Sequence, residues 1–213
     1  MGNKEGLKLS KNFMDNEIIP YILNFMTNGK KYRIKRDKNN KKLIKIMNKV
    51  YNNIKEQLKN INYVTIKIMS SINAKLNLAE NDSDIDIGIM INGLNKNKNI
   101  DIEKYTTIVQ ILNKMDFKFS HIFNPNNIDN QYFAFVKIIN GVEFEVKIRD
   151  LESSKTIMKL HDYLDTKLTN KQITLFTYVK YLLKKYKYEK SYSQFKKILY
   201  EWAFYNIKGG FIL

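Results

Sequence analysis

Two aspartates, Asp84 and Asp86, lie one residue apart in DIDIGIMI, an isoleucine-rich run at residues 84–91. The alternation predicts a strand with both carboxylates on one face and the isoleucines on the other. Like charges on one face repel, and burying either without a partner is costly. A divalent cation removes that cost, since Mg²⁺ binds one or two carboxylates together with substrate phosphates. The pattern predicts either a metal site here or an exposed edge strand with solvated charges.

A third carboxylate comes from a predicted hairpin at residues 131–150. Two alternating runs are joined there by Asn-Gly at 140–141, the strongest short signal for a type I′ turn. The second run places Glu143, Glu145 and Lys147 on its polar face. If it lies beside the aspartate strand, Glu145 joins the pair, and Glu143 does so in another register. Three converging carboxylates suit two-metal phosphoryl transfer.

The other elements that position these strands follow from periodicity. Apolar spacings of three and four predict helices, and β-branched content predicts one more strand. The expected order is helix, strand, strand, helix, two or three strands, then helices, with the first helix at 43–58, the first strand at 62–69 and the second helix at 100–115. This order predicts a mixed α/β (α+β) fold. We expect a basic N-terminal segment, a catalytic core and a helical region at 1–42, 43–150 and 151–213.

The charge of the chain favours a polyanionic partner. Lys and Arg number 37 against 21 acidic residues, a net charge of +16, and such an excess attracts nucleic acid. A coding bias toward Asn, Ile and Lys is the competing explanation. Ten of the twenty residues at 30–49 are basic, which predicts either RNA contacts or a solvated helix. The candidate RNA-binding residues are Lys30, Lys31, Arg33, Lys35 and Arg36.

Several classes of protein are disfavoured by what the sequence lacks. There is no cysteine, which excludes disulfides and a thiolate nucleophile and is compatible with a reducing compartment. No apolar run reaches membrane-spanning length, and no G-x-x-x-x-G-K motif indicates a P-loop. His121 and His161 lack ligand spacing and are expected to be structural or on the surface. The expected location is cytoplasmic, without a membrane partner.

The segment around the aspartates resembles a known family. Ser70 and Ser71 close one strand, and Ser83 precedes Asp84 and Asp86 at the start of the next. This resembles the nucleotidyltransferase superfamily of DNA polymerase β and the poly(A) polymerases. The resemblance implies a mixed sheet with helices packed on one face, followed by a small helical region.

The same resemblance assigns roles to residues. It implies that Asp84 and Asp86 bind the metals, that Glu145 is the third acid, and that Ser71 binds the triphosphate beside Ser70 and Ser83. The sequence departs from the family pattern in three ways. Ser70 replaces a glycine, the spacer between the serines and Asp84 is longer than in many members, and Glu145 replaces an aspartate.

A second segment narrows the branch of the family. FTYVKYLLKK at 176–185 resembles a helix of template-independent RNA nucleotidyltransferases. On that match Lys180 contacts the triphosphate and Lys184 lies close by, while Thr177 and Leu182 replace the family's Arg and Trp. An ordinary basic amphipathic helix is the alternative.

These resemblances imply an Mg²⁺- or Mn²⁺-dependent poly(A) polymerase-like enzyme of mRNA processing that transfers AMP from ATP to an RNA 3′ end. A nucleic-acid-activated cyclic-dinucleotide or oligoadenylate synthase would use the same site, and an inactive accessory RNA-binding subunit would keep the fold alone. Poly(A) polymerases usually continue into a further RNA-binding domain. We therefore expect a minimal enzyme, or one whose grip on RNA comes from a protein partner or a homodimer.

Overall fold

The sheet that carries the aspartates has five strands in the order β1-β2-β7-β6-β5. The computed structural model describes residues 19–73, 75–78, 84–96, 99–124 and 131–207. The bounds are β1 Val64–Ile68, β2 Ile85–Ile91, β5 Lys118–Phe123, β6 Tyr132–Ile139 and β7 Val142–Asp150. β2 and β7 are parallel and the other pairs antiparallel. A two-residue pairing joins β3 (Asn95–Lys96) to β4 (Asn99–Ile100). The predicted mixed α+β class is confirmed.

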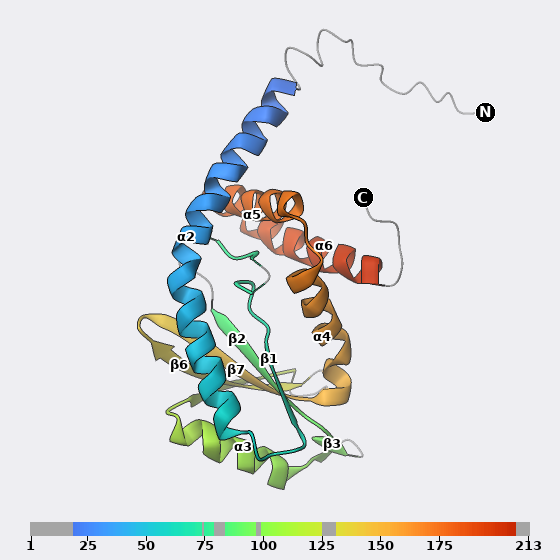
Figure 1. The fold of residues 1–213 in the computed structure, drawn as a ribbon. Helices are drawn as coiled ribbons and strands as arrows, with labels where there is room; N and C mark the ends of the chain where they lie inside the picture. The colour runs from blue at the N-terminus through green and yellow to red at the C-terminus, as the bar shows by residue number, and fades with distance from the viewer. Residues whose placement is uncertain (1–18, 74, 79–83, 97–98, 125–130, 208–213) are drawn as a thin grey trace, which may run out of the picture.

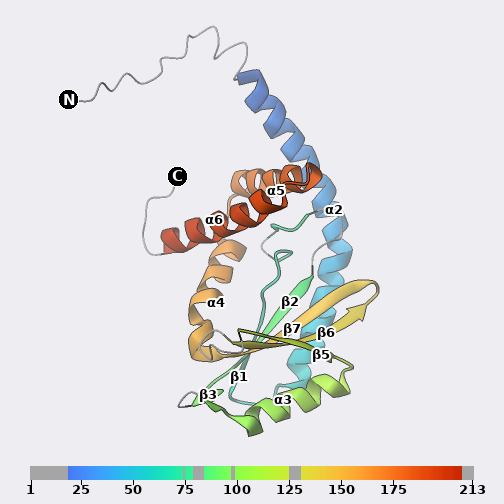
Figure 2. The same ribbon diagram turned by 180° about the vertical axis from the view of Figure 1, so that it is seen from behind.

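Two helices cover one face of this sheet, as Figures 1 and 2 show: α2 (Ile19–Gln57) and α3 (Ile102–Lys114). The isoleucines of β2 face them, because alternation turns Ile85, Ile87, Ile89 and Ile91 to one side. All four are fully buried in one core cluster with apolar residues of both helices. The isoleucine face is therefore the core, and Asp86 lies on the opposite face.

The C-terminal helices are α4 (Leu151–Thr166), α5 (Asn170–Lys185) and α6 (Glu189–Ile207). Asp150 ends β7 and caps α4 by accepting a hydrogen bond from the backbone N–H of Ser153, and Thr169 forms a capping box at the start of α5. Figure 1 shows α5 beside the N-terminal half of α2, with α6 packed on α5 and α4 leading from the sheet to both. None of the helices described is long and apolar enough to cross a membrane.

The helix predicted at 43–58 is the C-terminal part of a longer one. α2 runs unbroken from Ile19, so the boundary expected at residue 42 falls inside a helix. Its N-terminal half packs on α5 at Gly29, where an added Cβ would lie 3.1 Å from Thr174 and 3.4 Å from Tyr178. This packing against α5 stabilises the N-terminal half of α2, whose sequence shows little of the apolar periodicity that predicts a helix.

The hairpin between β6 and β7 has the predicted turn. Asn140 and Gly141 have φ angles of 53° and 76°, as a type I′ turn requires, and Ile139 pairs with Val142 across it. The turn fixes which residues of β7 face each side of the sheet, and so it positions Glu145.

Candidate active site

Asp86 and Glu145 are direct partners in the parallel β2–β7 pair. Lys147, two residues further along β7 and opposite Gly88, lies between them: its Nζ is 2.8 Å from Asp86 Oδ1 and 2.8 Å from Glu145 Oε2. The side chains of all three are largely buried, at 29%, 16% and 16% exposed. Two carboxylates from adjacent strands thus converge on one cation position, which the Lys147 ammonium fills.

The burial and charges of this cluster shift its pKa values. Burial raises the pKa of Asp86, and Glu145 adds to the rise while Lys147 opposes it. Burial also acts to raise the pKa of Glu145, but the hydrogen bond and charge of Lys147 outweigh it, so that pKa is lowered. Burial would lower the pKa of Lys147, yet the charges and hydrogen bonds of both carboxylates raise it. Glu145 and Lys147 are therefore ionised near neutral pH.

The donor chemistry of the pair suits a divalent cation. Carboxylate oxygens are the ligands that Mg²⁺ prefers, and the ammonium of Lys147 stands in for a cation bound by both. No three His, Asp or Glu side chains gather as a metal-binding group in the described part of the chain. Asp86 and Glu145 therefore fit one divalent cation, provided that the Lys147 ammonium moves away.

A cavity of about 220 Å³ opens beside this cluster, under α4 and α6. Asp86, Lys147 and Arg149 form its sheet side, and His161 and Tyr200 line it from the two helices. Burial, with the positive charges of Lys67, Arg149 and Lys147, lowers the pKa of His161 to about 4. His161 is therefore a neutral imidazole at pH 7.

Two cations face this cavity beside the carboxylates. Arg149 lies over the ring of Tyr132, with its Cζ 4.3 Å from the ring centroid, and its buried Nε has no hydrogen-bond partner within the protein. Burial lowers the pKa of Arg149. Arg149 and Lys147 give the cavity positive charge next to the carboxylate pair, an arrangement that suits phosphate oxygens.

Solved structures that match this fold include a transferase and a polymerase core. One is a cytoplasmic RNA terminal U-transferase, 14% identical, with a TM-score of 0.47 over 76% of this chain and 45% of that one. The other is the polymerase core of TRAMP, an RNA surveillance complex, 18% identical, with a TM-score of 0.41 over 66% of this chain and 41% of that one. This chain spans less than half of either structure. No family model and no curated protein matches the sequence.

Both are partial similarities of fold at low identity, with TM-scores below 0.5. At these identities they concern the fold alone. What this chain does has to follow from its own site residues.

The other predicted acids, Asp84 and Glu143, are exposed. Asp84 comes directly before β2. Glu143 pairs with Ile138 near the turn. Glu145, not Glu143, is thus the acid that lies opposite Asp86.

The predicted serines lie on the loop after β1. Ser70 is fully buried, and its hydroxyl accepts a 3.3 Å hydrogen bond from the backbone N–H of Ile72. Ser71 is half-buried, and its carbonyl accepts from the N–H of Leu76. Ser83 lies outside the described residues. Ser71 is the more accessible of the two described serines.

Two cations predicted to contact ligands are buried and hold this loop instead. Lys180 is 5% exposed, and its ammonium donates a 2.6 Å hydrogen bond to the Leu76 carbonyl. Arg36 is fully buried, donates to the Lys75 carbonyl and pairs with Asp37. Burial between α2, α5 and the loop turns both side chains toward backbone oxygens, and their contacts with a triphosphate and with RNA stay predictions.

The remaining predicted cations are more accessible. Lys184 is exposed on α5, Lys30, Lys31 and Lys35 are exposed on α2, and Arg33 is half-buried. These residues leave α2 with a basic surface, while Arg36 belongs to the interior.

The sequence predicted that His121 and His161 are structural or surface residues, and it did not single out Tyr200. His121, on β5, has its Nε2 4.0 Å from Glu145 Oε1, and His161 and Tyr200 line the cavity. All three reach the site through tertiary packing, and none carries a local spacing signal.

Proposed function

We propose that this protein is a template-independent nucleotidyltransferase that transfers nucleotides, with AMP from ATP as the first substrate to test, to the 3′ end of RNA. The observation that carries the proposal is the Asp86–Glu145 pair, in register on adjacent strands and bound by the Lys147 ammonium. Asp86 also lines a cavity to which Arg149 adds positive charge.

The pair would hold Mg²⁺ or Mn²⁺, which supplies positive charge for polarising a 3′-hydroxyl and bracing the phosphates. A second ion, with Asp84 among its ligands, belongs to the same proposal. The finer roles of Asp84, Ser71 and Lys184 follow the sequence resemblance.

The protein's own groups contribute binding and orientation. Arg149, together with Lys147 once its ammonium has left the carboxylates, would present positive charge to an anionic substrate in the cavity that Asp86 lines. Neutral His161 and the Tyr200 hydroxyl offer hydrogen bonds to the same cavity without adding net charge. Because this positive charge sits beside carboxylates on a rigid sheet, substrate phosphates can be positioned close to them.

The ion pairs of Lys147 favour a second candidate, an accessory RNA-binding subunit without activity of its own. If the ammonium stays between Asp86 and Glu145, those carboxylates are already neutralised and a metal ion gains little by replacing it. This candidate predicts RNA binding without metal-dependent incorporation.

The test is extension of a labelled RNA by purified protein with Mg²⁺ or Mn²⁺ and each nucleoside triphosphate separately. We expect ATP-dependent extension, lost in Asp86→Asn and in Glu145→Gln. Glu143→Gln is the matched control, because it is an exposed glutamate on the same strand. Soluble short products formed without RNA extension would instead identify a cyclic-dinucleotide or oligoadenylate synthase.

Two results contradict the proposal. If Asp86→Asn still incorporates nucleotides and its melting temperature is unchanged, the Asp86–Glu145 pair is not required for catalysis. RNA binding with no incorporation at any enzyme concentration leaves the accessory subunit as the function.

A further inference from the structure

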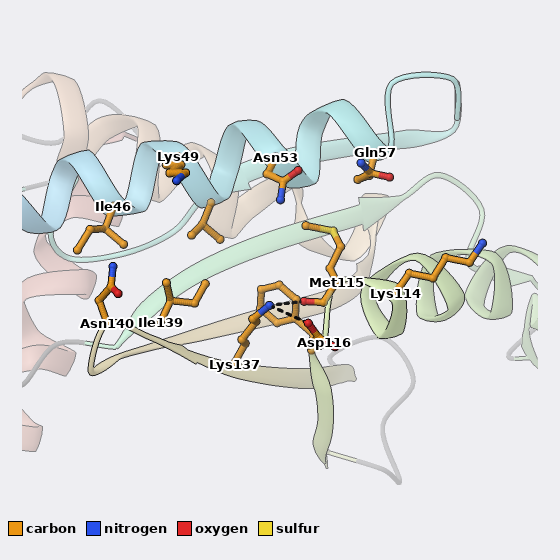
Figure 3. A pocket seen from close by; sticks show the side chains of 12 residues that line it. Ile46, Lys49, Asn53, Gln57, Lys114, Met115, Asp116, Lys137, Ile139 and Asn140 are labelled. Atoms are coloured by element: carbon orange, nitrogen blue, oxygen red, sulfur yellow. Dashed lines mark hydrogen bonds and ion pairs between the residues drawn. The ribbon is translucent and has the colours of Figure 1, made fainter.

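A cavity of about 460 Å³ lies on the face of the sheet opposite the carboxylates, enclosed by α2, the end of α3 and β6 (Figure 3). Its position follows from the strand register. Val136 pairs with Glu145, so the neighbouring Lys137, which pairs with Phe144, points to the other face. We call this cavity the α2 pocket. It is separated from Asp86 and Glu145 by the thickness of the sheet.

The α2 pocket combines an apolar wall with amides and lysines. Its apolar side includes Ile46, Val50 and Ile139. Polar side chains come from three elements, and Asn53 points from α2 toward β6 in Figure 3. The amides are Asn53, Gln57 and Asn140, and the lysines are Lys49, Lys114 and Lys137. At this volume the pocket is of the size that holds small ligands.

Among the residues that the structure describes, Asp116 is the one acid that lines the α2 pocket. Its Oδ2 lies 3.4 Å from the Nζ of Lys137, which also donates to the Met115 carbonyl at 2.6 Å. Asp116 thus has a lysine partner within the pocket, while Lys49 and Lys114 add two more positive charges. The pocket favours an anion.

A second cavity, of about 430 Å³, continues the α2 pocket along the same helix. The two share Ile46 and Asn140, and the second adds Lys38, Asn39 and Lys42. Together they form a path along α2 and the hairpin turn, lined by five lysines and one carboxylate. A path longer than one cavity suits a chain of phosphates better than a single nucleotide.

We propose that these two cavities bind single-stranded RNA, with one nucleotide seated in the α2 pocket and its neighbour beside Lys38 and Lys42. The choice of RNA rests on the proposed function together with the charge of the path. Amide side chains donate and accept along the edges of a base, the apolar wall covers its flat face, and lysines neutralise phosphates. RNA held here is gripped away from the carboxylates.

The test introduces carboxylates into the α2 pocket without changing shape. Asn53→Asp with Gln57→Glu places two negative charges among the lysines that would neutralise phosphates, and both side chains are exposed. Asn52→Asp with Gln110→Glu is the matched control: both residues are exposed, line neither cavity and change the net charge equally. The measurement is the anisotropy of a labelled oligoadenylate at low salt, with thermal melting of each variant.

We expect the pocket pair to weaken RNA binding by about tenfold and the control pair to change it little. Equal weakening in both pairs overturns the proposal, because binding would then follow net charge alone. Two further measurements test whether the ligand is an RNA strand. If AMP binds as tightly as the oligonucleotide, the site holds a single nucleotide and the proposal is wrong. If polyglutamate displaces the oligonucleotide at equal charge, the site accepts any polyanion and the proposal is equally wrong.

This result is separable from the test of the proposed function. If Asp86→Asn abolishes incorporation but the Asn53/Gln57 double variant binds RNA normally, only the proposal for the α2 pocket is contradicted. If the double variant binds RNA more weakly but the wild-type protein incorporates no nucleotide, only the proposed transferase function is contradicted.

Discussion

Lys147 donates a 2.8 Å hydrogen bond to Asp86 from the strand that also carries Glu145. Residues two apart on a strand share a face, so β7 supplies both a carboxylate and the ammonium that neutralises it. The same ammonium lies 2.8 Å from Glu145. The pair therefore has an internal cation, and any metal ion has to compete with it.

Removing the Lys147 charge should strengthen divalent cation binding. Lys147→Met keeps the length of the side chain and deletes the competing ammonium, leaving Asp86 and Glu145 facing each other. A hydrogen bond to a charged group contributes roughly 1.5–3 kcal/mol, so we expect Mn²⁺ affinity to rise by about tenfold or more. Titration followed by the electron paramagnetic resonance of free Mn²⁺ measures this without relying on activity.

Lys159→Met, an exposed lysine of α4, is the control and should leave Mn²⁺ affinity unchanged. Equal affinity in wild type and Lys147→Met, with clear binding in both, shows that the ammonium does not compete. Absence of Mn²⁺ binding in both proteins counts against the metal site itself.

Asn40 and Asn77 should be energetically coupled. Their buried amides exchange hydrogen bonds of 2.8 Å and 2.7 Å, which tie α2 to the loop that follows β1. Asn40→Ala leaves the Asn77 amide without this partner, and we expect a loss of roughly 1–3 kcal/mol in the free energy of unfolding. Urea denaturation of the two single variants and the double variant measures the coupling.

The double variant should lose less stability than the sum of the two single losses, by at least about 0.5 kcal/mol. Additive losses mean that the amides act independently. Asn48→Ala, an exposed asparagine of the same helix, controls for the change in helix propensity.

Local periodicity was sufficient to predict the faces of the sheet. Alternation put Asp86 opposite the buried isoleucines, and the Asn-Gly turn fixed which residues of β7 accompany Glu145. Whether Glu145 or Glu143 would lie opposite Asp86 remained open, because parallel pairing of β2 with β7 is set by the long connection through α3, β5 and β6. The structure resolves it in favour of Glu145.

The roles of the cations could not be predicted in the same way. A lysine on an amphipathic helix gives the same sequence pattern whether it reaches solvent or a buried carbonyl. Lys180 and Arg36 became interior because α2 and α5 enclose the loop after β1, a packing of three segments distant in sequence. His121 comes near Glu145 because β5 pairs with β6 with a register shift between Phe119 and His121. No local pattern in the sequence predicts that shift.

The Asn-Gly turn should be sensitive to a single methyl group although space is available. Gly141 has a φ of 76°, and an added Cβ meets nothing within 4 Å, so any cost of Gly141→Ala comes from the backbone. The left-handed region costs a non-glycine residue roughly 1–2 kcal/mol, and we expect thermal unfolding to report a loss of that size.

Asn140→Gly provides the comparison, since glycine adopts the φ of 53° at that position without strain and should change stability little. An unchanged melting temperature in Gly141→Ala contradicts the assigned turn conformation.

His161 should make the protein lose stability as the pH falls from 6.5 to 4. Its pKa is lowered from 6.5 to about 4 in the folded protein by burial and by Lys67, Arg149 and Lys147, against which Asp162 acts weakly. As the pH falls, His161 is therefore protonated in the unfolded chain before it is protonated in the folded protein. The free energy of unfolding decreases between pH 6.5 and about pH 4, below which His161 is protonated in both states. The difference corresponds to roughly 3 kcal/mol.

His161→Gln cannot take up this proton, so its free energy of unfolding should decline less than that of the wild type between pH 7 and pH 4. Urea denaturation at intervals of pH gives both curves. All other titrating groups are present in both proteins, so the difference between the curves reports the replacement of His161. Parallel curves would mean that His161 is protonated as readily in the folded protein as in the unfolded chain, and that its imidazole is not held neutral beside the carboxylate cavity.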